Sequence, residues 1–162
     1  MTKLHPWFGL VARLILGGTL IAAGYLKFDE LDKSQMAVRA YELLPIPLAN
    51  FLGVVLPFFE LAIGILLVFG AGVRISAALS ALLMLAFMIG ISQAWARGLS
   101  IDCGCFGGGG QVAPGEADYL TPLLRDTGLA ILAIYLTLFP HTKFGLDKKP
   151  QTATQLGDSA HG

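Results

Sequence analysis

Charged side chains are scarce in this sequence of 162 residues: 14% are Asp, Glu, Lys or Arg, whereas 55% are hydrophobic. An ordinary soluble domain carries about 25% charged residues, so the chain is too apolar for that class. Its formal net charge is zero and no block of basic residues recurs with interleaved aromatic residues, which argues against a nucleic-acid partner. The composition therefore predicts a membrane protein in contact with the lipid bilayer.

Four apolar runs are long enough to cross a bilayer, which requires about 20 residues per helix. The first run resembles a cleavable signal peptide only superficially, because it is longer than the usual apolar core, contains Arg13 and is followed by no clear cleavage site. We expect an all-α, four-transmembrane-helix bundle within residues 1–144 and a polar, disordered tail over residues 145–162. The expected helices cover residues 7–26, 48–69, 75–95 and 123–139.

The orientation of these spans follows from the loops. Four spans place both termini on one side of the membrane, but the basic residues divide evenly between the two faces and do not decide which side is cytoplasmic. A closely spaced thiol pair that performs disulfide chemistry belongs on the oxidising, extracytoplasmic side. The sequence therefore predicts a multi-pass cell-membrane protein with an extracytoplasmic loop before the last span and cytoplasmic termini.

Cysteine is scarce as well, and both cysteines lie in that loop, within "SIDCGCFGGGG". A disulfide between Cys103 and Cys105 would close a very small ring, so it would be strained and easily reduced. Gly104 relieves part of this strain because glycine adopts positive φ, and the glycines after the pair would allow the loop to move. These properties indicate a redox-active pair, with Cys103 and Cys105 as the candidate catalytic residues.

The neighbours of the pair are candidate supporting residues. Asp102 would either raise a thiol pKa by its charge or assist proton transfer. Phe106 would contact a partner or a quinone ring, or else dip into the membrane interface.

Three other interpretations of the cysteine pair carry less weight. Inert thiols usually lie buried among apolar residues, whereas this loop is polar and rich in glycine. A zinc site would need nearby nitrogen ligands, but the three histidines lie close to the termini, so no metal is expected. A static disulfide would tie together almost no chain and would add little stability.

Charged residues inside the spans form a second group of candidates. An unpaired charge at the centre of a transmembrane helix costs about 2.5–3.5 kcal/mol on insertion scales, so Arg13 in the first span and Glu60 in the second should face the bundle interior. We expect these two to form an ion pair, either as a structural element or as part of the site. Lys27 and Asp126, at the loop ends of the first and last spans, would form a second pair or anchor helix ends at the interface.

Four segments carry a family resemblance, namely "RLILGGTLIAAGYLKF", "LPFFELAIGILLVFG", "DCGCFG" and "RDTGLAILAIYL". From Arg13 to Leu138 the chain resembles the MauE family, the methylamine utilisation membrane proteins of the DoxX-like group. The resemblance implies a four-helix membrane protein associated with thiol–disulfide exchange in extracytoplasmic protein maturation, together with a thioredoxin-like partner. In methylamine users the family's substrate is the disulfide-rich small subunit of methylamine dehydrogenase, and the resemblance does not extend to assigning that substrate here.

The chain has only one cysteine pair, so this pair must exchange its electrons with a cofactor or with another protein. The first hypothesis is a membrane thiol–disulfide oxidoreductase that exchanges disulfides between Cys103/Cys105 and an extracytoplasmic thioredoxin-like partner or disulfide-containing client, coupled to a membrane quinone. The alternative is a non-enzymatic scaffold or maturation factor that recruits a redox partner. A metal-binding or transport protein is a weaker alternative, because no span is broken like the half-helices of transporters, although Pro57 would kink the second span.

Overall fold

The computed structural model describes residues 5–140, and the expected tail over residues 145–162 lies outside this range. Four of its helices are long and apolar enough to cross a membrane. The prediction of an all-α, four-transmembrane-helix bundle is therefore confirmed. The elements are α1 (His5–Asp29), α2 (Leu31–Ala40), α3 (Ile46–Phe69), α4 (Val73–Ala96), β1 (Ile101–Asp102), β2 (Gly110–Gln111) and α5 (Leu120–Leu138).

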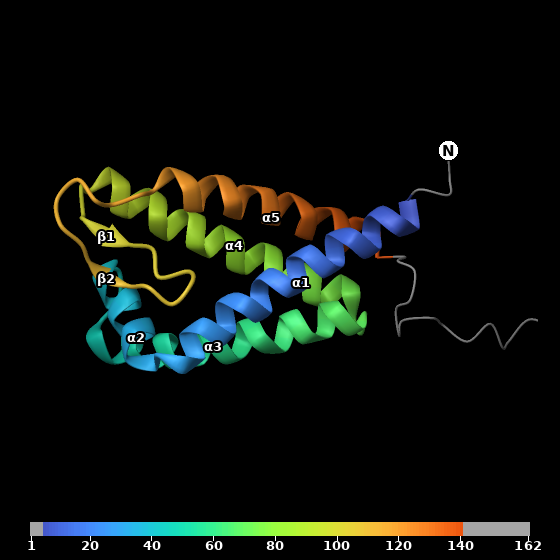
Figure 1. The fold of residues 1–162 in the computed structure, drawn as a ribbon, viewed down its shortest axis with the longest axis horizontal. Coiled ribbons are helices and arrows are strands. Elements are labelled where there is room, and N and C mark those ends of the chain that lie inside the picture. The colour runs from blue at the N-terminus through green and yellow to red at the C-terminus, as the bar shows by residue number, and fades with distance from the viewer. Residues whose placement is uncertain (1–4, 141–162) are drawn as a thin grey trace, which may run out of the picture.

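The four long helices form two closely packed pairs, α1 with α3 and α4 with α5 (Figure 1). The α1–α3 contact is tight because two glycines face each other across it. A Cβ atom on Gly17 would lie 2.9 Å from the carbonyl oxygen of Gly64, and a Cβ atom on Gly64 would lie 2.8 Å from that of Gly17. Small residues allow helix backbones to approach closely in lipid, so this pair sets the register of α1 against α3.

Proline and glycine residues explain where α3 begins and ends. Pro45 precedes α3, where its missing N–H is no loss, and Gly70 ends α3 in the left-handed conformation with φ 70°. Pro57 lies inside α3 and is buried, and the helix continues through it. At the end of the first span α1 continues to Asp29, three residues beyond the predicted bound, so Lys27 lies within the helix.

The short helix α2 was not expected from the sequence. Its ten residues, "LDKSQMAVRA", are too polar to stand out as an apolar run. Tertiary contacts hold it in place: the Ser34 hydroxyl donates a hydrogen bond of 2.7 Å to the Gly53 carbonyl of α3. At Gly53 a Cβ atom would lie 2.5 Å from the Cα atom of Gln35, so the two helices touch through their backbones. Such a short helix depends on packing rather than on intrinsic propensity.

The segment between α4 and α5 contains a small antiparallel hairpin, in which Ile101 pairs with Gln111 and Asp102 pairs with Gly110. The hairpin lies against α2, at the end of the bundle opposite the N-terminus (Figure 1). The connection between β1 and β2 turns back toward the middle of the bundle (Figure 1). This connection carries both cysteines, so the fold places them against the helices rather than at the tip of a projecting loop.

Candidate functional site

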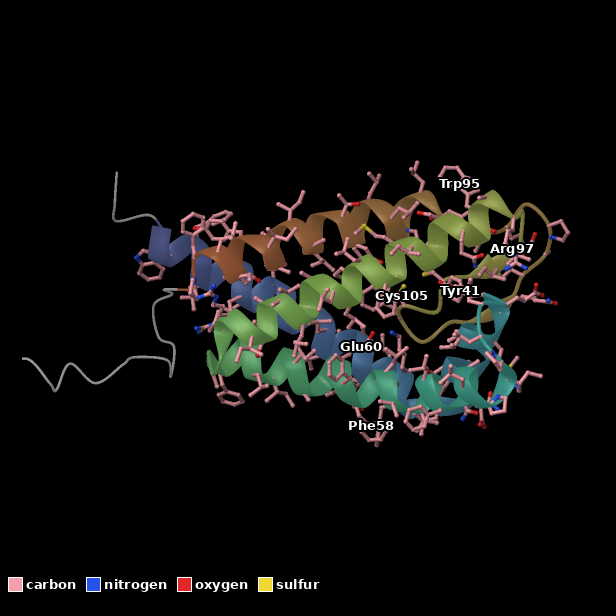
Figure 2. All side chains as sticks on the ribbon, turned by 180° about the vertical axis from the view of Figure 1, so that it is seen from behind. Tyr41, Phe58, Glu60, Trp95, Arg97 and Cys105 are labelled. Atoms are coloured by element: carbon pink, nitrogen blue, oxygen red, sulfur yellow. The ribbon has the colours of Figure 1, made fainter. Side chains whose placement is uncertain are left out.

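The two cysteines are free thiols in different surroundings. Cys103 is half-buried, whereas Cys105 is only 6% exposed. Cys105 points from the loop into the bundle, toward the level of Glu60, with Tyr41 beside the loop (Figure 2). One thiol therefore remains accessible from outside while the other faces the interior, a difference that their spacing in the sequence does not reveal.

The glycines around the pair allow the loop to lie directly on α2. Gly104 has φ +67°, which confirms the expected positive φ, and a Cβ atom there would collide with the Cβ atom of Ala37. A Cβ atom on Gly109 would lie 2.5 Å from the same Ala37 atom. Close packing thus explains two of the loop glycines, and their expected role in loop movement stays a prediction.

Asp102 and Tyr41 shape the turn that presents the thiols. The Asp102 carboxylate accepts a hydrogen bond of 3.2 Å from the backbone N–H of Gly104. The Tyr41 hydroxyl donates a hydrogen bond of 3.0 Å to the carbonyl of Cys103, and the Tyr41 carbonyl in turn accepts one of 3.0 Å from Gln93. Burial, followed by the neighbouring thiols, raises the pKa of Tyr41 above its ordinary value, so its hydroxyl remains a donor. Sequence reasoning missed Tyr41, because a single tyrosine in a connecting segment carries no signal.

Arg125 is a second residue that sequence reasoning missed. Its guanidinium lies 4.6 Å from the centre of the Phe106 ring, next to Cys105 in the loop, and lines the same cavity as Cys105. Two of its nitrogens also donate to Asp126 Oδ1, at 2.8 and 2.9 Å. The rule that singled out Arg13, a charge within an apolar span, applies equally to Arg125 and would have found it. Phe106 thus contacts a cation of α5, while its expected contact with a partner or the interface stays a prediction.

The ion pairs of the spans differ from the expected ones. Glu60 pairs with Lys27, whose Nζ lies 2.6 Å from Glu60 Oε1, and both side chains are buried. The predicted pairing of Glu60 with Arg13 is therefore wrong. Asp126 pairs with its neighbour Arg125, so a pair between Asp126 and Lys27, one of the two alternatives for these residues, does not form.

The helix register explains the first correction. Gly17 faces Gly64, so Arg13 lies four residues from this contact toward the N-terminus, and Glu60 lies four residues from it toward the cysteine loop. Eight residues at 1.5 Å each separate their levels by about 12 Å along the helix axes. Arg13 is buried on α1 all the same, as expected, but in the other half of the bundle.

A small cavity of about 20 Å³ lies beside the buried thiol. Residues of α1, α3, α4, α5 and the loop line it, including Glu60, Cys105, Arg125 and Asp126. This volume is enough for a single water molecule. Among the described residues, Glu60 Oε2 and Asp126 Oδ2 are buried and have no hydrogen-bond partner. The cavity is therefore lined by a thiol, two half-satisfied carboxylates and the cation of Arg125, and Lys27 contacts it only through Glu60.

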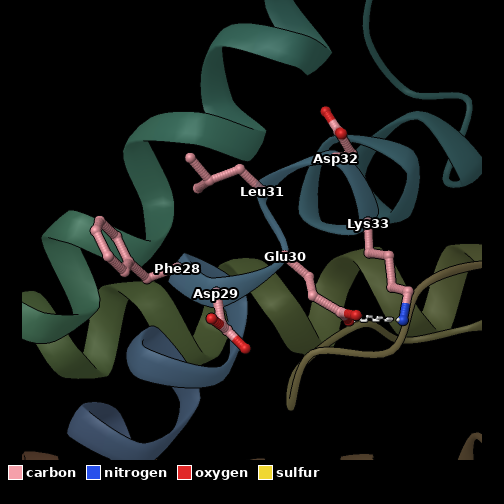
Figure 3. Close-up of a pocket in the computed structure, with 6 residues that line it drawn as sticks. All are labelled: Phe28, Asp29, Glu30, Leu31, Asp32 and Lys33. Atoms are coloured by element: carbon pink, nitrogen blue, oxygen red, sulfur yellow. Dashed lines mark hydrogen bonds and ion pairs between the residues drawn. The ribbon is translucent and has the colours of Figure 1, made fainter.

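A larger hollow of about 550 Å³ lies open at the surface where α1 meets α2 (Figure 3). All its lining residues come from positions 28–33, and Lys33 there lies 2.6 Å from Glu30 with both side chains about half exposed. Such an exposed pair contributes little energy. No thiol lines this hollow, so we place the candidate site at the smaller cavity, where the reactive groups meet.

The two thiols differ in acidity as well as in exposure. Hydrogen bonding from the Cys105 side chain lowers the pKa of Cys103 from 9.0 to about 7, with a smaller contribution from the charge of Arg125. Hydrogen bonding with the Cys103 side chain, together with burial, raises the pKa of Cys105. Because the thiolate is the reactive form, Cys103 is the thiol prepared to react first at neutral pH.

The chain was compared with known proteins. The profile of the family described as methylamine utilisation protein MauE matches residues 5–139. The chain belongs to the MauE family. No curated protein and no solved structure matches it. The family match covers the four spans and the whole cysteine loop, so this MauE-family chain is a multi-pass membrane protein whose cysteine pair lies within the family's common region.

Proposed function

We propose that this MauE-family protein is a membrane thiol–disulfide oxidoreductase in which Cys103 exchanges disulfides with a thioredoxin-like protein or disulfide-containing client. Cys105 acts as the resolving thiol. The observation that supports this role is the asymmetry of the pair: Cys103 is half-buried with a pKa of about 7, whereas Cys105 is 6% exposed with a raised pKa. A scaffold that only holds a partner would need one accessible thiol and no buried second one.

The exchange proceeds in two balanced steps. The Cys103 thiolate attacks a disulfide of the partner, which forms a Cys103–partner bond and releases one partner sulfur as thiolate. The Cys105 thiolate then attacks the Cys103 sulfur, which forms the Cys103–Cys105 disulfide and releases the second partner sulfur. The pair is oxidised by two electrons, the partner disulfide is reduced by two, and the two protons of Cys103 and Cys105 are released. The reverse sequence oxidises a partner dithiol.

In this proposal the cysteine loop faces the extracytoplasmic side, where disulfides persist. The expected coupling to a membrane quinone stays a prediction, and no step is routed through it. The cavity beside Cys105, at about 20 Å³, has space for one water molecule and none for a quinone ring. In the proposed exchange the oxidant is therefore a protein disulfide.

A trapping experiment in cells tests the proposal. Cys105→Ala should accumulate a mixed disulfide on Cys103, because the resolving step is lost, and mass spectrometry of the trapped species would identify the partner. Cys103→Ser is the matched control and should trap nothing, because the buried thiol is out of a partner's reach. Equal trapping by both variants, or an unchanged redox state of the partner in the double variant, would overturn the oxidoreductase assignment.

The proposed side of the loop has its own test. A membrane-impermeant maleimide should label Cys103 in intact, reduced cells, with labelling lost in Cys103→Ser. Labelling that requires permeabilised cells would place the loop on the cytoplasmic side.

A further inference from the structure

The resolving step raises a question of proton transfer. Cys105 must lose its proton before it attacks, yet its sulfur lies inside the loop and its side chain is almost entirely buried. A thiol in that position cannot pass its proton directly to bulk water. Some group in the cavity must accept it if the step is to occur at a useful rate.

The charged groups around Cys105 are few enough to compare. Lys27 comes from α1, Tyr41 from the end of α2, Glu60 from α3, and Arg125 and Asp126 from α5, while Asp102 and Cys103 belong to the loop. The cavity residues of α4, Met84 and Phe87, carry no charge. Only the three carboxylates offer an oxygen that can accept a proton, because Lys27, Arg125 and the Tyr41 hydroxyl all act as hydrogen-bond donors here.

Asp126 fits this role better than the other two carboxylates. Asp102 turns toward the loop backbone, where it accepts from Gly104, and it does not line the cavity. Glu60 is 2.6 Å from the Lys27 cation of α1, whereas Asp126 is bound to Arg125, which also contacts Phe106, the loop residue next to Cys105. Arg125 donates to Asp126 Oδ1, which leaves the buried Oδ2 of this cavity-lining residue without a partner among the described residues.

We propose that Asp126 is the proton acceptor for Cys105, through one water molecule held in the cavity that Cys105, Glu60, Arg125 and Asp126 line. This role deepens, and rests on, the proposed disulfide exchange. The Cys105 proton passes to the water while a water proton passes to Asp126 Oδ2, which leaves a thiolate beside the Arg125 guanidinium. The thiolate then attacks the Cys103–partner disulfide as described above. In the reverse direction Asp126 returns the proton to the Cys105 sulfur as the ring opens.

The inference can be tested with a small disulfide in place of the partner. The reduced full-length protein in lipid nanodiscs is mixed with 4,4′-dithiodipyridine, which releases a coloured thiopyridone at each attack. The first release reports Cys103, and the second reports Cys105 resolving the mixed disulfide. Asp126→Asn should leave the first phase within about twofold and slow the second by roughly a hundredfold, the usual size of a lost general base. Asp126→Glu should recover most of the second phase.

The pH profile separates a proton acceptor from a structural residue. In the wild-type protein the second phase should be nearly flat from about pH 6 to 8, because the proton moves within the site and no net proton is lost before the attack. In Asp126→Asn it should rise about tenfold per pH unit, as expected when hydroxide must remove the proton. The wild-type profile requires no variant to fold, and thermal melting checks the variants. Thr127→Ala, an exposed neighbour on α5, serves as the control and should match the wild-type protein.

The outcomes are distinct. No release of either thiopyridone from the wild-type protein would refute the proposed disulfide exchange itself. Two phases that are alike in wild type and Asp126→Asn, or a wild-type second phase that already rises tenfold per pH unit, would refute only the role of Asp126. A larger loss in Glu60→Gln than in Asp126→Asn would also refute it and would assign the proton to Glu60.

Discussion

The two halves of the α1–α3 contact consist of different kinds of residue, glycines in one half and charged side chains in the other. Near the termini Gly17 and Gly64 bring the backbones together with no side chain between them. Near the cysteine loop the same two helices contribute Lys27 and Glu60, a buried ion pair. Ten residues of α1, or about 15 Å, separate the two arrangements.

The comparison shows how the protein can keep charges inside a membrane. The glycine contact sets the register of α1 against α3, and that register brings Lys27 to Glu60. A loop that lies on α2 then covers the charged half, where α5 adds Arg125 and Asp126. The close-packed half thus sets the helix register, and the charged half contains the candidate site. Substitutions in one half or the other should therefore have different effects, and the largest is expected in the charged half.

Lys27→Met should have the largest effect, because it leaves Glu60 as a buried, unpaired charge. Breaking one side of a buried pair costs about 3–5 kcal/mol of the free energy of unfolding, which denaturant titration in micelles would measure. The double variant Lys27→Met, Glu60→Leu should recover most of this loss. Lys33→Met is the control, because its pair with Glu30 is about half exposed and should contribute less than about 1 kcal/mol. Equal losses in the two lysine variants would mean that Lys27 is not buried as described.

Gly104→Ala should displace the loop that covers the charged half. Its φ of +67° strains any other residue by about 1–2 kcal/mol, and the added methyl group would also overlap Ala37. Gly98→Ala is the control, with φ +68° and no atom within 4 Å, so it carries the strain alone. Alkylation of Cys105 should accelerate only in Gly104→Ala. Equal acceleration in both variants would contradict the packing of the loop on α2.

Cys105→Ala should change the acidity of Cys103. The Cys105 side chain is the largest cause of the lowered pKa, so its removal should move the midpoint of Cys103 alkylation upward from about 7 toward 9.0. Reaction at neutral pH would then slow, because less of the thiol is ionised. Cys105→Ser retains a hydrogen-bond donor and should keep much of the lowering. Alkylation rates measured across pH would show this, and a midpoint unchanged in Cys105→Ala would assign the shift to other groups.

Gly17→Ala should open the close-packed half. The new methyl group would lie 2.9 Å from the Gly64 carbonyl oxygen, and such overpacking typically costs about 1–3 kcal/mol. Gly18→Ala is the control on the same helix, since nothing lies within 4 Å of a Cβ atom there. Thermal melting in detergent compares the two. If Gly17→Ala is as stable as the wild-type protein, the glycine contact does not set the register.

Tyr41→Phe should have the smallest effect. It removes the hydrogen bond to the Cys103 carbonyl, which contributes about 1 kcal/mol, and should speed alkylation of Cys105 by loosening the loop. Tyr25→Phe, at a side chain 63% exposed, should change neither quantity. An unchanged alkylation rate in Tyr41→Phe would show that the hairpin and α2 hold the loop without it.

Much of the architecture could be predicted from the sequence, because the length of an apolar run and the scarcity of charge are properties of the chain alone. They indicated four spans, and all four have bounds within three residues of those observed. The polar helix α2 was missed because its contacts with α3 hold it, and these contacts join residues that are distant in the sequence. The same holds for the hairpin, whose two strands have two residues each.

The candidate site, like the fold, could be predicted from the sequence only in part. The sequence by itself singled out the cysteine pair together with Lys27, Glu60 and Asp126, since such groups in a loop or in apolar spans are unusual wherever they lie. The tertiary structure alone decided that Glu60 meets Lys27 rather than Arg13, that Cys105 faces inward, and that Arg125 contacts both Phe106 and Asp126. The physical reason is that an ion pair forms only when its two charged groups lie within a few ångströms of each other. A helix moved by two turns shifts a charge by about 11 Å, and backbone contacts such as that of Gly17 with Gly64 set this shift.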